Sequence, residues 1–231
     1  LIALVNGSLG KYNIQTDLAR LDKKKLFSTL KNESAFSDMV AKDEAMAMVF
    51  HQVEAVAETD YSVVINGESG TGKEKLARLI HALSKRKKGP FYAVNMASFS
   101  KTIFEDEFFG HAKGAFTGAV TDRKGKFQQA HGGTIFLDEI SEMSMNLQAK
   151  MLRVLQEGEV DPVGGKSPIS IDSRVVASTN RDLKEWVSQG SFREDLYYRL
   201  NVFPVTLPPL RERPDDVLLL AENFRKRFIK E

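Results

Sequence analysis

The sequence predicts an α/β fold in which a mostly parallel, five-stranded sheet lies between helices. Five short apolar runs alternate with helical or irregular segments, so that the order strand, loop, helix recurs along the chain. The runs lack a clean polar and apolar alternation, which is typical of strands covered on both faces. The predicted strands are "YSVVING", "PFYAVNM", "GTIFLDEI", "RVVASTN" and "NVFPVTL".

The helices are predicted from apolar residues at helical spacing. Residues 12 to about 31 predict a connecting helix, and the polar stretch "KNESAFSD" after it is a candidate domain boundary. "AMAMVFHQVEAVAE" predicts a helix with one apolar face, and "KEKLARLIHALSKR" predicts the helix after the first strand. A later helix is expected to place these side chains in the core: Met143, Met145, Leu147, Met151, Leu152 and Leu155.

The composition is that of an ordinary globular protein: of its 231 residues, 42% are hydrophobic and 28% are charged. A formal net charge of +2 gives no reason to expect nucleic-acid binding, and we interpret the basic run at 85–88 as a solvated turn. Without a basic stripe interleaved with aromatic residues, a nucleic-acid motor has little support. The four histidines lack metal-ligand spacing, which favours packed or surface roles: His51, His81, His111 and His131.

The absence of cysteine excludes disulfides and thiolate metal sites, which fits a reducing compartment. The apolar residues 1–5 are too short for a signal segment or a membrane span. We therefore expect a cytoplasmic protein without membrane contact. Its helical-looking, charged end indicates a fragment of a longer polypeptide.

A glycine-rich stretch between the first strand and the next helix matches a phosphate-binding loop. "GESGTGKE", residues 67–74, has the pattern G-x-x-x-x-G-K, in which backbone N–H groups and a helix N-terminus face a polyphosphate and Lys73 reaches its terminal phosphates. Glu74 stands where a Mg²⁺-binding Ser or Thr is usual, so that Thr71 or a water would serve. The alternative is a glycine-rich turn without a ligand. The predicted binding residues are Gly67, Glu68, Ser69, Gly70, Thr71, Gly72, Lys73 and Glu74.

Two acidic residues end the strand in "GTIFLDEI". Ligands of open α/β sheets lie at the carboxyl ends of the strands. Asp138 is therefore predicted to hold Mg²⁺, directly or through water, and Glu139 to polarise the water that attacks a γ-phosphate. The alternative for both is a helix-start role, which the helix dipole favours.

Three further polar residues suit the same chemistry. Asn180 ends the fourth strand in "ASTN", and its amide could position a water or a γ-phosphate oxygen. Arg193 and Arg199 lie in "FREDLYYRL", and guanidinium groups stabilise the charge of phosphoryl transfer, often from a second subunit. A salt-bridged surface helix explains the two arginines equally well.

The stretch "KGAFTGAV" places Phe116 and Thr117 between Gly114 and Gly118. Flanking glycines favour a bendable loop over a strand or a helix. In such a loop Phe116 is either hidden in the core or exposed for contact with another molecule.

Together these motifs closely resemble the central ATPase domain of bacterial enhancer-binding proteins, the sigma-54-dependent transcription activators of the AAA+ class. The resemblance runs from about residue 34 to the C-terminus and rests on "GESGTGKE", "FFGHAKGAFTGA", "GGTIFLDEI", "LQAKMLRVLQEGE", "VVASTN" and "FREDLYYRLNVFPVTLPPLRER". It implies an AAA+ P-loop ATPase with a linker helix or upstream regulatory region at 1–33, the α/β ATPase part at 34–208 and the start of a helical lid at 209–231. It also implies ATP, Mg²⁺ and a hexameric ring.

The resemblance gives the glycine-flanked loop a partner. In the family this loop contacts the sigma-54 factor of RNA polymerase holoenzyme in a nucleotide-dependent way. "GEVDPVGGKSPISID" resembles the family's second insertion, which assists the loop. DNA contact is expected only through a domain outside this chain. The matching loop residues are Gly114, Ala115, Phe116, Thr117, Gly118 and Ala119.

The resemblance also implies roles for residues near the nucleotide. Asn95 matches an asparagine that holds the catalytic glutamate, here Glu139, until the partner is engaged. Arg193 and Arg199 match arginines presented to the nucleotide of the neighbouring subunit.

Four other residues match or depart from the family pattern. Met39 and Val40 resemble the edge of the adenine pocket. Ala112 stands where Glu is common and Pro162 where Arg is common. Both departures lie in the parts that couple hydrolysis to the partner.

Two functional hypotheses follow. The first is an ATP-hydrolysing ring that remodels sigma-54 RNA polymerase holoenzyme so that promoter DNA melts. The second is a nucleotide-gated binding module that uses ATP only as a ligand. The presence of a full hydrolytic set favours the first: Lys73, Asp138, Glu139, Asn180, Arg193 and Arg199.

Overall fold

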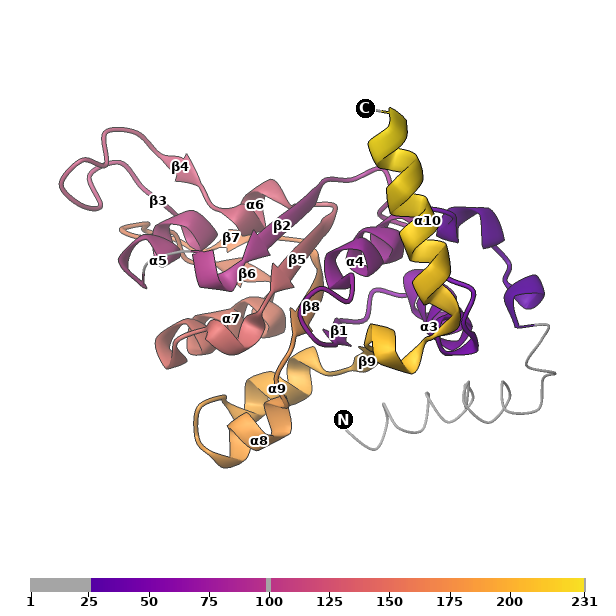
Figure 1. Ribbon diagram of the computed structural model, residues 1–231. Coiled ribbons are helices and arrows are strands. Elements are labelled where there is room, and N and C mark those ends of the chain that lie inside the picture. Colours follow the sequence, from indigo (N-terminus) through magenta and orange to yellow (C-terminus); the bar gives the residue numbers. More distant parts are fainter. Residues whose placement is uncertain (1–25, 99–100, 231) are drawn as a thin grey trace. The chain divides into compact units, whose positions relative to one another are not determined.

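The computed structural model describes residues 26–98 and 101–230 (Figure 1). Contacts divide the chain into two units, one of residues up to 55 together with those from 208 onward, the other of residues 56–207. The sequence-predicted boundaries at 33 and 208 stay predictions. Most of the helix predicted at 12–31 lies outside the described residues.

A five-stranded parallel sheet forms the centre of the unit at 56–207, as the sequence predicts. The strand order is β2-β5-β8-β1-β9, and each neighbouring pair is parallel. The three inner strands are almost wholly buried, which explains their continuous apolar runs, and Pro204 is tolerated because β9 is an edge strand. The strands are β1 (Val63–Asn66), β2 (Phe91–Asn95), β5 (Thr134–Asp138), β8 (Arg174–Thr179) and β9 (Phe203–Thr206).

The two faces of the sheet carry alternate strand residues, because successive side chains of a strand point to opposite sides. Val64, Leu137 and Ala177 join a core cluster with apolar residues of α5, α7 and α9. Helix α4 packs against the opposite face of the sheet. There the buried imidazole of His81 forms a hydrogen bond with the Thr134 hydroxyl (2.9 Å). Burial lowers the pKa of His81, and its packed role is confirmed.

The helices and turns of this unit follow the predicted alternation with strands (Figure 1). Two short antiparallel ribbons, which the sequence did not predict as strands, interrupt it: β3 (Gly110–His111) with β4 (Arg123–Lys124), and β6 (Glu159–Val160) with β7 (Ile169–Ser170). The helices and turns are α4 (Lys73–Ala82), η4 (Met96–Ser98), α5 (Lys101–Phe109), α6 (Lys126–Gln129), η5 (Ile140–Glu142), α7 (Met145–Glu157), α8 (Leu183–Ser188) and α9 (Glu194–Leu200).

The predicted core residues around α7 are buried or partly buried, with one exception. Met151 and Leu147 are buried on the inner face of the helix, whereas Met145 is 46% exposed. The prediction for Met145 is wrong because this residue opens the first turn, about 200° around the helix from Leu147. Met143 is buried but lies just before the helix.

The other described unit contains residues 44–55 of helix α3 and the segments packed against them. Phe36, inside the stretch predicted to be a polar interruption, is buried and stacks on Phe50 with ring centroids 4.3 Å apart. Buried Asp216 accepts hydrogen bonds from the backbone N–H groups of Lys42 (2.6 Å) and Asp43 (2.9 Å). The elements are η2 (Phe27–Thr29), η3 (Glu33–Phe36), α3 (Glu44–Ala57), η6 (Leu210–Glu212) and α10 (Asp215–Lys230).

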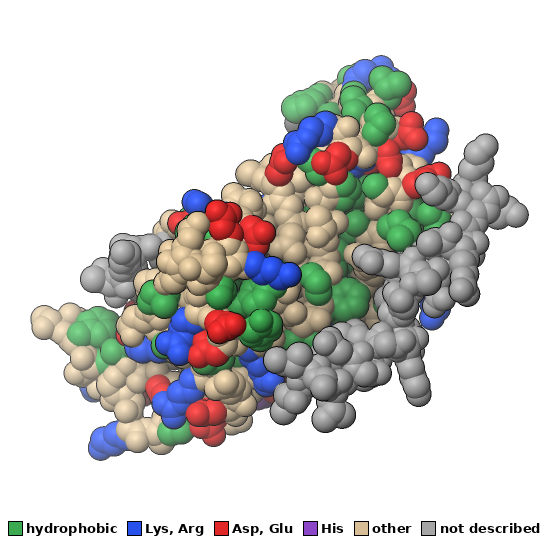
Figure 2. Space-filling model, turned by 90° about the horizontal axis from the view of Figure 1, so that it is seen from below, with side chains coloured by type: hydrophobic (Ala, Val, Ile, Leu, Met, Phe, Trp, Pro, Cys, Tyr) green, Lys and Arg blue, Asp and Glu red, His purple; other side chains and the backbone are tan. Residues whose placement is uncertain are grey.

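On the face shown in Figure 2, basic and acidic side chains lie close together, and no basic stripe is seen. Among the described residues, no helix combines the length and the apolar character needed to cross a membrane. This surface is consistent with the nearly balanced charge of the sequence.

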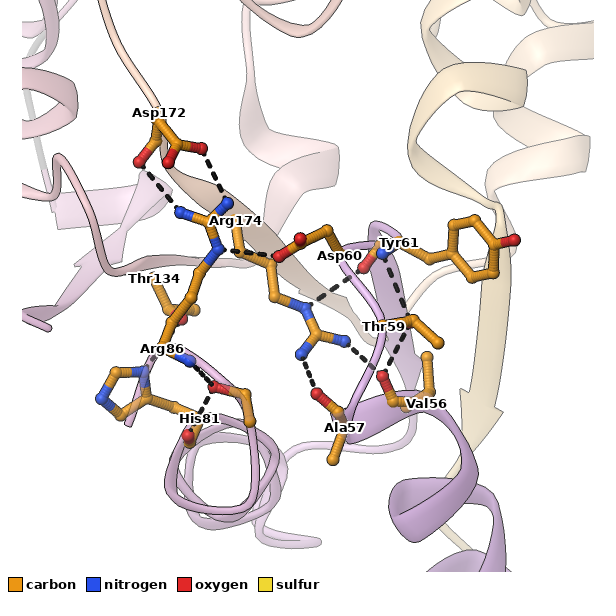
Figure 3. Close-up of polar contacts among 11 residues, drawn as sticks. Val56, Ala57, Thr59, Asp60, Tyr61, His81, Arg86, Thr134, Asp172 and Arg174 are labelled. Atoms are coloured by element: carbon orange, nitrogen blue, oxygen red, sulfur yellow. Dashed lines mark hydrogen bonds and ion pairs between the residues drawn. The ribbon is translucent and has the colours of Figure 1, made fainter. Parts of the chain in front are cut away.

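The basic run at 85–88 is only partly a solvated turn, because Arg86 is engaged in ion pairs (Figure 3). Its guanidinium donates to Asp172 (2.7 Å) and Asp60 (2.8 Å), and only 17% of the side chain is exposed. The hydrogen bond with Asp172 raises the pKa of Arg86, and the same contact lowers the pKa of Asp172. The interpretation as a solvated turn is wrong for Arg86 and holds for its exposed lysine neighbours.

Arg174, the first residue of β8, holds the C-terminal end of α3 (Figure 3). Its guanidinium donates to the carbonyl oxygens of Val56 (2.8 Å), Ala57 (2.8 Å) and Tyr61 (3.3 Å). The last carbonyls of a helix have no partner within the helix, so these bonds satisfy groups that burial would otherwise penalise. Burial lowers the pKa of Arg174 to about 10, which leaves the group charged at neutral pH.

Replacing Arg174 by Met should destabilise this unit. We expect the free energy of unfolding to fall by about 3 kcal/mol, because buried carbonyl oxygens lose their donor. Urea denaturation of the purified chain measures the change. Arg153→Met, which removes an exposed arginine paired with Glu157, is the matched control and should leave the unfolding midpoint in place. Equal midpoints for Arg174→Met and the unchanged protein would contradict the capping role.

Candidate functional site

The glycine-rich segment at 67–74 forms a loop between β1 and α4, in the context that the sequence predicts. Lys73 is the first residue of α4, and its buried side chain folds back over the loop. Its Nζ donates to the carbonyl oxygens of Gly67 (3.0 Å) and Glu68 (3.2 Å). The ammonium group is therefore held at the loop.

The backbone of this loop needs its glycines and leaves room above it. Gly70 (φ +80°) and Gly72 (φ +102°) lie in the left-handed region, which side chains other than glycine rarely adopt. A Cβ added at Gly67 would lie 2.9 Å from Thr71 Oγ1, whereas one added at Gly70 would meet no atom within 4 Å. Glycines at these positions leave the backbone N–H groups of the turn uncovered at the start of α4, which is what a phosphate-binding loop uses.

Asp138, the last residue of β5, receives hydrogen bonds from both neighbouring strands. Its Oδ1 accepts from the Ser178 hydroxyl of β8, and its Oδ2 accepts from the Asn95 amide of β2 (3.2 Å). Asn95 was expected to hold Glu139, but in the structure its amide binds the adjacent Asp138. The reason is the register of the sheet, which places Asn95 directly opposite Asp138.

Glu139 has an unusual backbone. Within residues 26–98 and 101–230, it is the one non-glycine residue with a positive φ (+56°). Strained conformations of this kind gather at functional sites, where surrounding contacts hold them. The Glu139 N–H donates to Ser178 Oγ (3.3 Å), and its Oε1 lies 3.4 Å from Lys73 Nζ. The ion pair joins the glycine-rich loop to the acidic pair.

The remaining predicted polar residues are Asn180, Arg193 and Arg199. Asn180 follows β8 directly and is exposed, at the same carboxyl edge of the sheet. Arg193 precedes α9 and donates to Asp195 through Nε (3.0 Å) and Nη2 (2.7 Å). This hydrogen bond raises the pKa of Arg193 and lowers that of Asp195.

Arg199 lies in the last turn of α9, at the other end from Arg193. Its Nε and Nη2 donate to the Leu155 carbonyl oxygen at 3.0 and 2.7 Å. Both arginines thus have partners within the chain, and the structure does not bring them together at one point. The alternative prediction of a salt-bridged surface helix fits Arg193 in this structure, since Arg193 forms an ion pair with Asp195.

Met39 and Val40 line a cavity of about 580 Å³ in the unit that contains α10. Its walls are mainly apolar and aromatic, which suits a flat heterocycle. Other residues of the lining include Phe27, Leu30, Phe36, Phe50, Leu219 and Asn223.

The glycine-flanked loop connects β3 to β4 and extends away from the sheet (Figure 1). Gly114 (φ +83°) and Gly118 (φ +105°) provide its two sharp bends. The Gly114 N–H donates to the Ala119 carbonyl (2.8 Å), which closes the loop at its base. Phe116 is 47% exposed and Thr117 is exposed, so the ring is half-covered and not hidden in the core.

The segment between β6 and β7 contacts this loop through its backbone. Val163 donates to the Gly110 carbonyl (2.8 Å), and its own carbonyl accepts from Ala112 N–H (3.0 Å). A Cβ added at Gly164 would lie 2.7 Å from the Cβ of Ala115, too close for two carbon atoms. Glycine at 164 therefore allows the two insertions to touch.

Ser178 and Gln148 contact the predicted site residues but were not identified from the sequence. Ser178 binds both Asp138 and Glu139, and its position in a buried strand next to the acids is visible only in the sheet. Gln148 is fully buried and accepts from the Arg193 N–H (2.8 Å). A polar residue between Leu147 and Met151 in an apolar helix face was an available signal for Gln148.

Replacing Gly164 by Ala should loosen the glycine-flanked loop. We expect faster amide hydrogen exchange at Gly114 and Ala119, because the new methyl group displaces Ala115. Gly190→Ala is the matched control: Gly190 has the same φ of +69°, but a Cβ there meets no atom within 4 Å. Equal exchange rates of the loop in the two variants would show that the contact does not hold it.

Comparisons with known proteins give the context of this geometry. The sequence matches the family described as "Sigma-54 interaction domain" over residues 39–206. It is 48% identical over 219 residues to the nitrogen fixation protein VnfA of Azotobacter vinelandii, covering 95% of this chain and 42% of that protein. It is 52% identical over 193 residues to the transcriptional regulator NtrC of Rhizobium meliloti (strain 1021), covering 84% of this chain and 40% of that protein.

A solved structure shows the same architecture. NtrX from Brucella abortus, crystallised in complex with ATP, superimposes with a TM-score of 0.77 at 34% identity, covering 98% of this chain and 49% of that one. The chain thus spans less than half the length of these relatives. By its match and its sheet, the chain belongs to the sigma-54 interaction domain family and has the AAA+ P-loop ATPase fold.

Proposed function

We propose that this chain is the ATP-hydrolysing domain of a sigma-54-dependent transcription activator and that its loop at 114–119 engages the sigma-54 factor. The observation that carries the proposal is the 3.4 Å contact between Lys73 and Glu139, which unites the phosphate loop with the acidic pair. The activity of the whole protein is part of this proposal, since the chain spans under half of its relatives.

The triphosphate of ATP binds along residues 67–74. The backbone N–H groups of the loop and the N-terminus of α4 face the anion, and the open space above Gly70 admits it. When ATP binds, Lys73 leaves the carbonyl oxygens of Gly67 and Glu68 and the carboxylate of Glu139 and binds phosphate oxygens. Phosphate oxygens carry more negative charge than the carbonyl oxygens. Binding of the substrate thereby frees the Glu139 carboxylate. By the family resemblance, Met39 and Val40 are proposed to contact the adenine.

Mg²⁺ would be held by the Asp138 carboxylate, with Thr71 or a water as a further oxygen ligand. Hydrogen bonds from Ser178 and Asn95 fix the orientation of this carboxylate, as the residues around a metal ligand commonly do. Oxygen ligands are those that Mg²⁺ prefers, and the ion neutralises charge on the β- and γ-phosphates.

Glu139 acts as the base of the hydrolysis. It accepts a proton from water while the water oxygen attacks the γ-phosphorus, the bond to the β,γ-bridging oxygen breaks, and ADP leaves with the electron pair. Asn180, at the same sheet edge, positions the water or a γ-phosphate oxygen. Asn95 restrains Asp138 in the resting state. To hold Glu139 itself, it exchanges its present partner Asp138.

Arg193 and Arg199 complete the site of a neighbouring subunit in a ring, for which we propose six copies. Arg193 is partly exposed, and its contact with Asp195 can be replaced by a phosphate oxygen. Buried Gln148 fixes the backbone of Arg193, so the arginine is carried by a rigid element. Hydrolysis therefore depends on assembly.

The glycine-flanked loop at 114–119 has the features of a protein contact point. Phe116 and Val120 are 47% and 74% exposed, and an aromatic side chain on an exposed loop is a common anchor of protein interfaces. Contact between Val163, Gly164 and the loop gives the second insertion a direct route to it.

The second hypothesis, a nucleotide-gated binding module, is favoured by Ala112 and Pro162, which lack the charged groups common in the family. Against it, the contacts of Val163 next to Pro162 are made by the backbone, so coupling between the insertions does not need those charges. A pure binder also has no need of Glu139 beside the phosphate loop.

Replacing Glu139 by Gln should separate binding from turnover. We expect ATP affinity to change less than about threefold and turnover to fall at least about 100-fold, because the base is lost. Steady-state phosphate release and equilibrium ATP binding measure the two effects. Glu142→Gln, a nearby exposed acid paired with Arg181, should retain turnover. Unchanged turnover in Glu139→Gln would overturn the role of the base.

Mixing two inactive variants tests the shared site. Glu139→Gln supplies Arg193 and Arg193→Ala supplies Glu139, so mixed rings contain some intact sites. Activity should reappear on mixing, and the specific activity of the unchanged protein should rise with its concentration. If ATP binds but neither effect is seen at any concentration, the binding module is the better account.

Replacing Thr117 by Ala should spare ATP turnover and weaken the partner contact. We expect turnover to stay within about twofold and the affinity for purified sigma-54 factor to fall at least about tenfold. Fluorescence anisotropy with labelled sigma-54 measures the affinity. Ser167→Ala removes an exposed hydroxyl from the second insertion and serves as control. Full sigma-54 binding by Thr117→Ala would count against the loop as the contact point.

A further inference from the structure

Phe116 rests against the imidazole of His111. The two rings meet in a T-shaped arrangement with centroids 5.0 Å apart and an interplanar angle of 68°. Arrangements of this kind are favourable beyond the area that they bury. Since Phe116 remains 47% exposed, the contact supports the ring without hiding it.

His111 is itself held in place. Its Nδ1 donates to the carboxylate of Asp106, and the two side chains are only 10% and 16% exposed. Asp106 also accepts from Nη1 of Arg123 (3.1 Å), which pairs with His111 across the β3–β4 ribbon. The carboxylate of Asp106 therefore holds the imidazole of His111, and Arg123 holds that carboxylate.

The support continues into the body of the unit through helix α5. Glu105, next to Asp106, accepts from Asn146 (2.8 Å) and Lys150 (2.6 Å) of α7. Helix α7 contributes Leu147 and Met151 to the main core. A continuous set of contacts thus runs from the core to the ring of Phe116.

We infer that His111 is a positioning residue for Phe116: it presents the ring of the loop to the sigma-54 factor. The inference rests on the proposed function of the loop at 114–119. Histidine suits this place because it combines a ring for the contact with Phe116 and a donor for Asp106. Asparagine keeps a donor and loses the ring, and phenylalanine keeps a ring and loses the donor.

The test measures sigma-54 affinity of the full chain in the presence of ADP and aluminium fluoride, a mimic of the transferring phosphoryl group. His111→Asn should bind sigma-54 about three- to tenfold more weakly, the factor expected for loss of one aromatic contact. His111→Phe should fall between His111→Asn and the unchanged protein. ATP turnover should stay within about twofold in both variants. The unfolding midpoint should fall more in His111→Phe, which removes the donor to Asp106, than in His111→Asn, which keeps one. The order of the two variants is thus opposite for stability and for sigma-54 affinity, which separates positioning from folding.

Phe116→Ala distinguishes the two ways of failing. If Phe116→Ala loses sigma-54 binding while His111→Asn binds as tightly as the unchanged protein, this inference is overturned and the proposed function stands. If Phe116→Ala also binds as tightly as the unchanged protein, the proposed role of the loop fails and the inference fails with it.

A spectroscopic measurement reports the ring contact without any partner. The chain has one tryptophan, Trp186. In a Trp186→Phe background, Phe116→Trp places the single fluorophore beside His111, whose imidazole quenches indole emission on contact. Adding His111→Asn should raise the emission intensity. Equal emission with and without His111 would show that the imidazole does not hold the ring.

Discussion

The contact between Lys73 and Glu139 is the interaction on which the proposed chemistry depends. The two residues follow β1 and β5, which are not neighbours, since β8 lies between them. The contact therefore requires the parallel order of three strands, whose carboxyl ends share one edge. Ser178 of β8 fills the middle of that edge and binds both acids. The left-handed backbone of Glu139 is the local cost of this geometry, about 1–3 kcal/mol by comparison with similar strained residues.

Strand β8 connects two kinds of polar site. At its first residue, Arg174 satisfies the end of α3 and is bonded to carbonyl oxygens, so its role is structural. Near its last residues, Ser178 orients carboxylates at a ligand-facing edge. The difference follows from the direction of a parallel sheet, where ligands gather at the carboxyl ends and the amino ends are free to be closed by packing and ion pairs.

The glycine-flanked loop combines bendable ends with a supported tip. Gly114 and Gly118 permit the bends, while His111 and Gly164 provide contacts from two different segments. Backbone bonds of Val163 link the second insertion to the loop independently of the side chains at 112 and 162. The contact between the two segments therefore does not depend on the charged side chains that are common in the family at 112 and 162.

The sequence by itself determined the five sheet strands, the phosphate loop between strand and helix, and the glycine-flanked loop, because each is encoded by neighbours in the chain. Only the tertiary structure decided that Asn95 binds Asp138, that Arg86 is paired rather than solvated, and that Met145 is exposed. It also placed Ser178 between the acids and Gly164 against Ala115. These facts depend on sheet register and on contacts between distant segments. Local spacing restricts which residue types can stand at a position, but the partner of a side chain is set by the elements that packing brings beside it.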